Sequence, residues 1–164
     1  MTVNIYMYHT IHSPGTKAGS FTYILETEIN GKVATLTKTD ILEPTTENKA
    51  ELTVLLKALK RLRKECDVLV YGAGTYIKTG CEEWIDKWIS AGWKNAKGKD
   101  VANMEEWQQF QEFRERYNIT ICPDTKHSYS EWMQTTTDKK EKERKLCTTD
   151  SENSTAHRKS TQQQ

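Results

Sequence analysis

The sequence has no run of apolar residues approaching the about 20 that a membrane span needs. Its four cysteines are scattered, with no C-x-x-C pair and no histidine at zinc-ligand spacing: Cys66, Cys81, Cys122 and Cys147. The start "MTVNIYMYHTI" lacks the charged segment and apolar block of a secretory signal. We therefore expect a cytoplasmic protein with reduced thiols and no membrane partner.

Neither sign of charge is in excess, because 24 Lys and Arg residues face 23 Asp and Glu residues. Net charge therefore points to no class of partner, and any basic surface has to come from local clustering. The 164 residues suit one domain with a sizeable core.

Three β-strands are predicted at the start of the chain. Residues 3–8 alternate between apolar and polar and are rich in β-forming side chains. Residues 21–29 and 32–42 flank Asn30-Gly31, a dipeptide typical of a two-residue hairpin. The three strands are expected to form an antiparallel meander.

The period then changes to that of helices. A leucine series at helical spacing follows Thr46, a suitable N-cap: Leu52, Leu55, Leu56, Leu59 and Leu62. Residues 68–71 form a continuous apolar strand, as expected when both of its faces are covered. Further elements are predicted at 75–92 (one or two helices), 103–117 (helix), 118–123 (strand) and 128–134 (helix). The order βββαβααβα indicates an α/β fold.

The composition changes from about Thr135, after which Lys, Glu, Ser, Thr and Gln dominate. "KKEKERK" is compatible with a prolonged helix, but the end "TAHRKSTQQQ" has too little apolar surface to offset chain entropy. We expect a domain over residues 1–134 and a polar, disordered tail over residues 135–164.

Two glycines close the apolar strand in "VLVYGAGTY". Gly72-Ala73-Gly74 lacks both the G-x-G-x-x-G spacing and the Lys-Ser/Thr of a P-loop. It also follows the fourth strand, where neither nucleotide-binding fold places its fingerprint. A phosphate loop is not indicated, and close packing of helix on strand is the simpler interpretation.

Two stretches stand out beside the order of elements: "GCEEWIDKWISAGWKNAKGKDVANMEEWQQF" (residues 80–110) and "TENKAEL" (residues 46–52). The first is similar to the handle of the type 1 ribonuclease H family and the helix after it, and the second resembles the start of that family's first helix. The resemblance covers residues 2–134. The resemblance implies a ribonuclease H-like, five-stranded mixed sheet, with three antiparallel strands first and helices on its faces.

The resemblance also implies an activity, hydrolysis of the RNA strand of an RNA–DNA hybrid. Two Mg²⁺ or Mn²⁺ ions held by four carboxylates would activate the water and stabilise the leaving oxygen. Carried over by position, Glu51 matches the first-helix glutamate and His127 the loop histidine, whose implied role is proton shuttling or product release. The other three carboxylate positions fall on Tyr8, Ala73 and Ser130.

One carboxylate of four is thus matched, and Glu51 is the one candidate metal ligand by resemblance. Other oxygen and nitrogen ligands stand near the motifs, at Glu47, Asp124, Glu131, His9 and His12. All of these are also ordinary surface residue types. Without a rebuilt site, no cofactor is expected.

Hybrid binding is a separate possibility from cleavage. Trp93, Lys94, Lys97 and Lys99 mix aromatic and basic side chains in the handle, a combination suited to backbone phosphates. Thr46 and Asn48 stand where the family presents polar groups to the minor groove of the hybrid. The alternative is that tryptophans at this spacing are core residues and that the lysines are solvated.

Three functions follow from these residues. The first is a binder of RNA–DNA hybrid or related duplex with a degraded two-metal centre. The second is a divergent ribonuclease H that still cleaves the RNA strand through Glu51. The third is a non-catalytic module that keeps the fold and binds a protein partner, whose identity the sequence leaves unknown.

Overall fold

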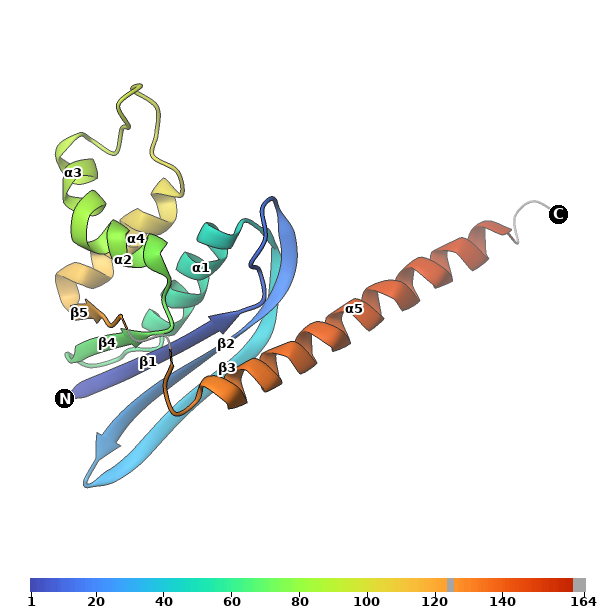
Figure 1. Ribbon diagram of the computed structural model, residues 1–164, viewed down its shortest axis with the longest axis horizontal. Coiled ribbons are helices and arrows are strands. Elements are labelled where there is room, and N and C mark those ends of the chain that lie inside the picture. Colours follow the sequence, from blue (N-terminus) through green and yellow to red (C-terminus); the bar gives the residue numbers. More distant parts are fainter. Residues whose placement is uncertain (124–125, 161–164) are drawn as a thin grey trace.

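The computed structural model describes residues 1–123 and 126–160, and side chains as far as residue 149. A five-stranded sheet in the order β3-β2-β1-β4-β5 forms its centre (Figure 1). β1 (Thr2–His9), β2 (Lys17–Ile29) and β3 (Lys32–Thr45) are antiparallel, whereas β4 (Asp67–Tyr71) and β5 (Asn118–Ile121) run parallel to β1. The predicted mixed sheet, with its antiparallel strands first, is confirmed.

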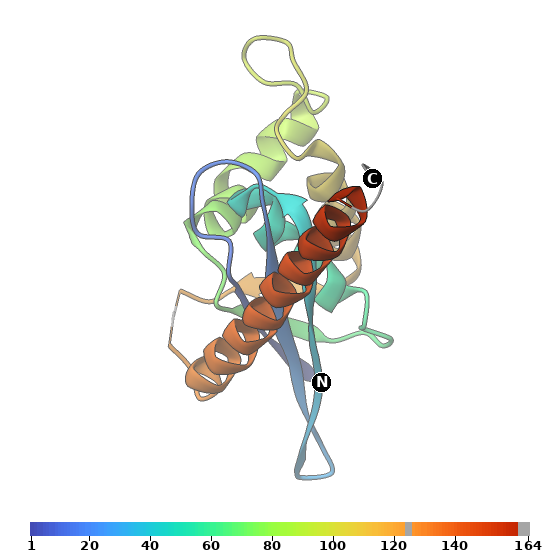
Figure 2. The ribbon, with the colours of Figure 1, turned by 90° about the vertical axis from the view of Figure 1, so that its right-hand side faces the viewer.

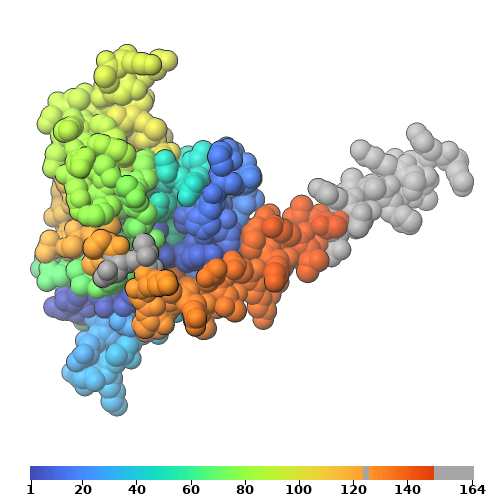
Figure 3. All heavy atoms as spheres, in the orientation of Figure 1, coloured from blue at the N-terminus to red at the C-terminus, as the bar shows by residue number. Residues whose placement is uncertain are grey.

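The β2–β3 hairpin turns at Asn30 and Gly31, which have φ values of 52° and 75°. Two successive left-handed residues make the type I′ turn whose twist matches that of the strands. The hairpin is long, and its tip projects from the body of the molecule (blue in Figure 3). Two large apolar side chains beside the turn, Ile29 and Val33, are consequently exposed.

Most helices lie on one face of the sheet (Figure 1). They are α1 (Glu47–Leu59), α2 (Thr75–Thr79), a π-helical turn η1 (Gly80–Trp84), α3 (Ile85–Ser90) and α4 (Met104–Arg116). Thr46 is the N-cap of α1, as predicted, because its hydroxyl accepts a hydrogen bond from the Lys49 amide. The α1 leucines and Trp107 of α4 are buried in the main core beneath these helices.

The last helix, α5 (Ser130–Ser160), covers the opposite face over β1, β2 and β3 (Figure 2). It continues well past residue 134, where the sequence pattern predicts the end of the domain. Thr137 is fully buried and lies 2.7 Å from the Thr22 hydroxyl, and Ser20 donates a 2.7 Å hydrogen bond to Glu141. Met133 packs with Tyr6 and Ile24, but beyond it hydroxyl and carboxylate groups make the contact, so the helix does not show the usual hydrophobic period. Neither α5 nor any other helix in the described ranges could cross a bilayer.

The structure therefore corrects the predicted boundary at residues 134 and 135. Residues 135–149 form a helix packed on the sheet instead of a disordered tail, and residues 150–160 continue it. The polar end "TQQQ" (161–164) lies outside the described residues. The domain thus extends at least as far as Glu141.

Candidate functional site

A hollow of about 580 Å³ lies at the carboxyl ends of β1 and β4, beside the start of α5. Its lining includes Tyr8, Ala73, His127 and Ser130, which lie far apart in the sequence. The structure therefore brings together the three residues matched to absent carboxylates and the predicted loop histidine. Glu51 does not line this hollow.

The turn after β4 explains where Glu51 lies. Gly72 has φ +85°, and a Cβ there would stand 2.4 Å from the Met7 carbonyl oxygen, so only glycine fits. The backbone N–H of Gly74 donates a hydrogen bond to Oε1 of Glu51. Ala73, between the two glycines, packs its methyl group against the main core. The glycine pair therefore serves close backbone packing, as the simpler interpretation predicts.

Glu51 is a buried carboxyl, 6% exposed, on the sheet-facing side of α1. Burial raises its pKa, and the Gly74 hydrogen bond opposes that shift only in part. Within residues 1–123 and 126–149, no group of three or more His, Cys, Asp or Glu side chains could hold a metal ion. A lone, hydrogen-bonded carboxyl does not fit the ligand set of a Mg²⁺ pair.

Tyr8 occupies the first-strand position with a half-buried phenol. Burial raises its pKa, and so does the carboxylate of Asp138 on α5, to which the phenol donates a hydrogen bond. Sequence reasoning missed Asp138 because the predicted domain ends before it. The contact joins the end of β1 to α5 and leaves a neutral group where an anion is expected.

His127 is held firmly beside the hollow. Its Nδ1 accepts a hydrogen bond of 3.2 Å from the Tyr129 amide, and its own amide donates one of 2.9 Å to Ser130 Oγ. Its ring lies 4.6 Å from that of Tyr6. Burial lowers the pKa of His127, so the neutral ring with its proton on Nε2 is favoured. It could donate a proton or a hydrogen bond from that nitrogen.

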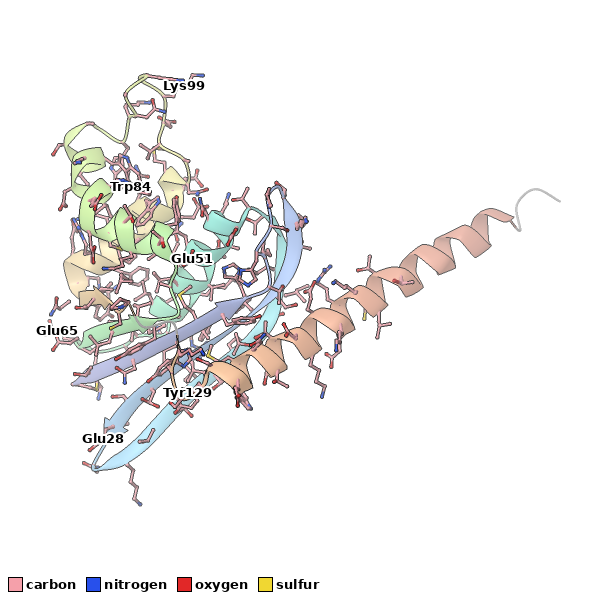
Figure 4. The ribbon with its side chains drawn as sticks, in the orientation of Figure 1. Glu28, Glu51, Glu65, Trp84, Lys99 and Tyr129 are labelled. Atoms are coloured by element: carbon pink, nitrogen blue, oxygen red, sulfur yellow. The ribbon has the colours of Figure 1, made fainter. Side chains whose placement is uncertain are left out.

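A tyrosine cluster that the sequence did not single out supports this loop. Glu26 accepts hydrogen bonds from Asn4, Tyr6 and Tyr129. Burial and this carboxylate raise the pKa of Tyr6 to about 12. Tyr129 and Glu51 lie on opposite faces of the sheet (Figure 4). Alternation along β1 could have shown that Tyr6 and Tyr8 share one face, but not what faces them.

Among the described residues, the other proposed ligands do not form a group that could hold a metal ion. Glu47 and His12 are 3.8 Å apart, and both are exposed. His9 is buried and stacks on His12 with ring centroids 4.8 Å apart. Glu131 is exposed at the rim of the hollow. Asp124 lies outside the described residues.

The predicted binding residues fall into two groups. Thr46 and Asn48 are exposed at the start of α1. Lys94, Lys97 and Lys99 are exposed on the handle loop (residues 91–103), which reaches one end of the molecule, where Figure 4 labels Lys99. Lys94 forms an ion pair with Asp100.

Hydrogen bonds and aromatic contacts of its own side chains stabilise the handle loop. Asn95 Oδ1 accepts hydrogen bonds from the amides of Lys97 and Lys99, at 2.9 and 3.1 Å. Trp93 is half-buried, and its ring centroid lies 6.4 Å from that of Trp88. The ring centroid of Trp88 lies 5.4 Å from that of the buried Trp107. The handle tryptophans Trp84, Trp88 and Trp93 thus pack as partly buried residues, while the lysines stay at the surface.

Fold and site together define a ribonuclease H-like protein. The family model described as RNase H matches residues 9–122, and the chain belongs to that family. It is 36% identical over 76 residues to ribonuclease H of Francisella tularensis subsp. novicida. The matched segment covers 46% of this chain and 50% of that protein. The chain thus spans about half the length of the curated relatives it matches.

Solved structures agree on the fold. LC9-RNase H1, a type 1 enzyme with the type 2 active-site motif, superposes with a TM-score of 0.69 at 17% identity, over 85% of this chain and 72% of that one. The RNase H domain of PFV superposes with a TM-score of 0.58 at 20% identity, over 87% of this chain and 92% of that one. LC11-RNase H1 in complex with an RNA/DNA hybrid superposes with a TM-score of 0.53 at 16% identity, over 80% of this chain and 92% of that one.

Proposed function

We propose that this chain binds RNA–DNA hybrid or a similar duplex and has lost two-metal hydrolysis. The observation that carries the proposal is the contact of Gly74 with Glu51. The matched carboxylate is engaged by the chain's own backbone and does not line the hollow where the reacting phosphate would lie. The other three matched positions, Tyr8, Ala73 and Ser130, carry no carboxylate, and Glu131 is a carboxylate only at the exposed rim of the hollow.

Loss of hydrolysis follows from the chemistry of the ligands. Mg²⁺ and Mn²⁺ prefer oxygen ligands, and carboxylates supply the negative charge that keeps two such ions close together. A methyl group, a serine hydroxyl and a phenol of raised pKa supply none of that charge at neutral pH.

Duplex binding is supported by the surface that remains. The lysines of the handle loop and the polar start of α1 are exposed on the same side of the sheet as α1 to α4. Phosphate contacts give affinity without reading sequence, so they do not depend on the state of the catalytic centre. The complex of LC11-RNase H1 with an RNA/DNA hybrid is one precedent among the similar structures.

A divergent hydrolase is the alternative that the family favours. Its general acid or base would be His127, whose ring is oriented at the hollow by Tyr129 and Tyr6. A protein-binding module without nucleic-acid affinity is the third possibility, favoured by the balanced net charge.

One experiment separates the first two functions. The purified chain and a Glu51→Gln variant are incubated with an end-labelled RNA–DNA hybrid in Mg²⁺, Mn²⁺ and EDTA, and the same samples are run on native and denaturing gels. The proposal expects a shifted hybrid and no metal-dependent cutting. Cutting that disappears in Glu51→Gln would establish the hydrolase, and no shift at low salt would refute duplex binding.

A further inference from the structure

An apolar groove of about 330 Å³ lies at the base of the projecting β2–β3 hairpin, on the face of the sheet covered by α1. Its floor includes Leu25, Ala34 and Leu36. Leu25 and Leu36 are paired across the two strands and therefore point to the same face. Ile29 and Leu36 are 54% and 40% exposed, although both are large apolar side chains. Contiguous exposed apolar surface of this kind marks an interaction site.

Three cations form the rim of the groove, Arg61, Arg63 and Lys64, in the loop after α1. Among the residues with described side chains, none of the three has a carboxylate partner in an ion pair. Glu26 also borders the groove, but Tyr6 and Tyr129 hold its carboxylate on the opposite face. The rim is therefore basic, and it complements an acidic partner.

A free strand edge lies beside the groove. In the part of the chain that the structure describes, β3 is the end strand of the sheet and pairs only with β2, so no described strand satisfies the backbone groups on the outer edge of its 14 residues. Natural proteins protect such edges, because an extended chain can add to them as a further strand. Leu36 and Ala34 belong both to this strand and to the groove.

We propose that an extended segment of a partner protein adds to the outer edge of β3. Its apolar side chains cover Ala34 and Leu36, and a cluster of carboxylates at one end meets Arg61, Arg63 and Lys64. The surface is distinct from the handle loop and the hollow, and it does not depend on the duplex-binding function.

The test uses the full chain and a fluorescent, end-capped peptide in which Val alternates with Thr before a run of Glu. Fluorescence anisotropy should show saturable binding. A matched peptide with Lys in place of Glu should bind about tenfold more weakly. An Arg61→Glu/Arg63→Glu variant should reverse that preference, whereas Lys87→Glu on α3 should leave it unchanged. Both changes are at exposed positions, and an unaltered melting temperature would show that folding is intact.

Backbone pairing has its own control. The Glu peptide with N-methyl groups on alternate residues keeps its charge but cannot complete the β-ladder, and it should also bind about tenfold more weakly. Equal binding of all three peptides would overturn the proposal. So would concentration-dependent dimers that Leu36→Lys abolishes, because the occupant would then be a second copy. Loss of RNA–DNA hybrid binding in Arg61→Glu/Arg63→Glu would assign the surface to nucleic acid instead.

Discussion

The backbone N–H of Gly74, at the end of β4, donates a hydrogen bond to the carboxylate of Glu51 on α1. A Cβ at residue 74 would stand 3.0 Å from that carboxylate oxygen, which is closer than side chains ordinarily approach. The turn after β4 and the first helix are thus fitted to each other through one buried carboxyl. In this family member the contact makes Glu51 a structural residue as well as a candidate ligand.

Replacing Glu51 with Gln should change how stability depends on pH. The pKa of Glu51 is raised, so the native state binds more protons than the unfolded state above about pH 4.5, and stability falls as the pH rises through the native pKa. Gln removes this loss. Urea denaturation from pH 4 to pH 8 should show the variant gaining stability relative to the parent as the pH increases. A constant difference across that range would contradict a raised pKa.

His9 should remain neutral well into the acidic range. Burial, and the charge of His12 to a lesser extent, lowers its pKa from 6.5 to about 4. A histidine of lowered pKa binds fewer protons when folded, so stability is lost as the pH falls from 6.5 towards 4. The ring resonances of His9 in an NMR titration should have a midpoint near pH 4. In His9→Gln the acid-dependent loss of stability over this range should be smaller, and an unchanged loss would count against it.

Gly72→Ala should destabilise the fold more than Gly98→Ala. Both glycines have positive φ, +85° and +76°, which costs an alanine about 1 kcal/mol. At Gly72 the new methyl group also meets the Met7 carbonyl, whereas nothing lies within 4 Å of the same position at Gly98. We expect the free energy of unfolding, measured by chemical denaturation, to fall by about 3 kcal/mol in Gly72→Ala and by about 1 kcal/mol in Gly98→Ala. Equal decreases would mean that β4 can move away from β1.

Truncation should separate the folded part of α5 from its remainder. A chain ending at residue 134 lacks the hydrogen bonds of Thr137 with Thr22 and of Glu141 with Ser20, and part of its sheet is uncovered. Its stability should fall by several kcal/mol, and thermal melting should show the decrease. A chain ending at residue 149 keeps these hydrogen bonds and should melt like the parent. If both truncations melt alike, the polar side chains of α5 do not contribute to stability.

The handle lysines should determine the salt dependence of hybrid binding. Removing one interaction between a lysine and a phosphate should reduce the slope of log K against log[salt] by about 0.9. Lys94, Lys97 and Lys99 changed together to Ala should therefore give a weaker and shallower dependence. The control changes Lys32, Lys38 and Lys60 to Ala, which removes the same charge elsewhere. If the control lowers the slope equally, net charge and not the handle loop governs binding.

Local sequence determined much of the architecture. Alternation over residues 3–8, the Asn30-Gly31 turn and the leucines after Thr46 each depend on neighbouring residues, and each was found as predicted. Strand ends and helix starts converge in this fold, and they bring several residues named from the sequence to one place. Tyr8, Ala73, His127 and Ser130 surround one hollow.

Tertiary structure decided the features that depend on distant partners. The Glu51–Gly74 contact, the Asp138 carboxylate facing Tyr8 and the Thr22–Thr137 pair join segments whose residue types alone show no preference for one another. After Met133, helix α5 packs through hydroxyls and carboxylates, so its polar sequence resembles a solvated tail until the sheet supplies the matching groups. Apolar periodicity can be read along a chain because it is local, whereas hydrogen-bond complementarity becomes visible only when both partners are in place.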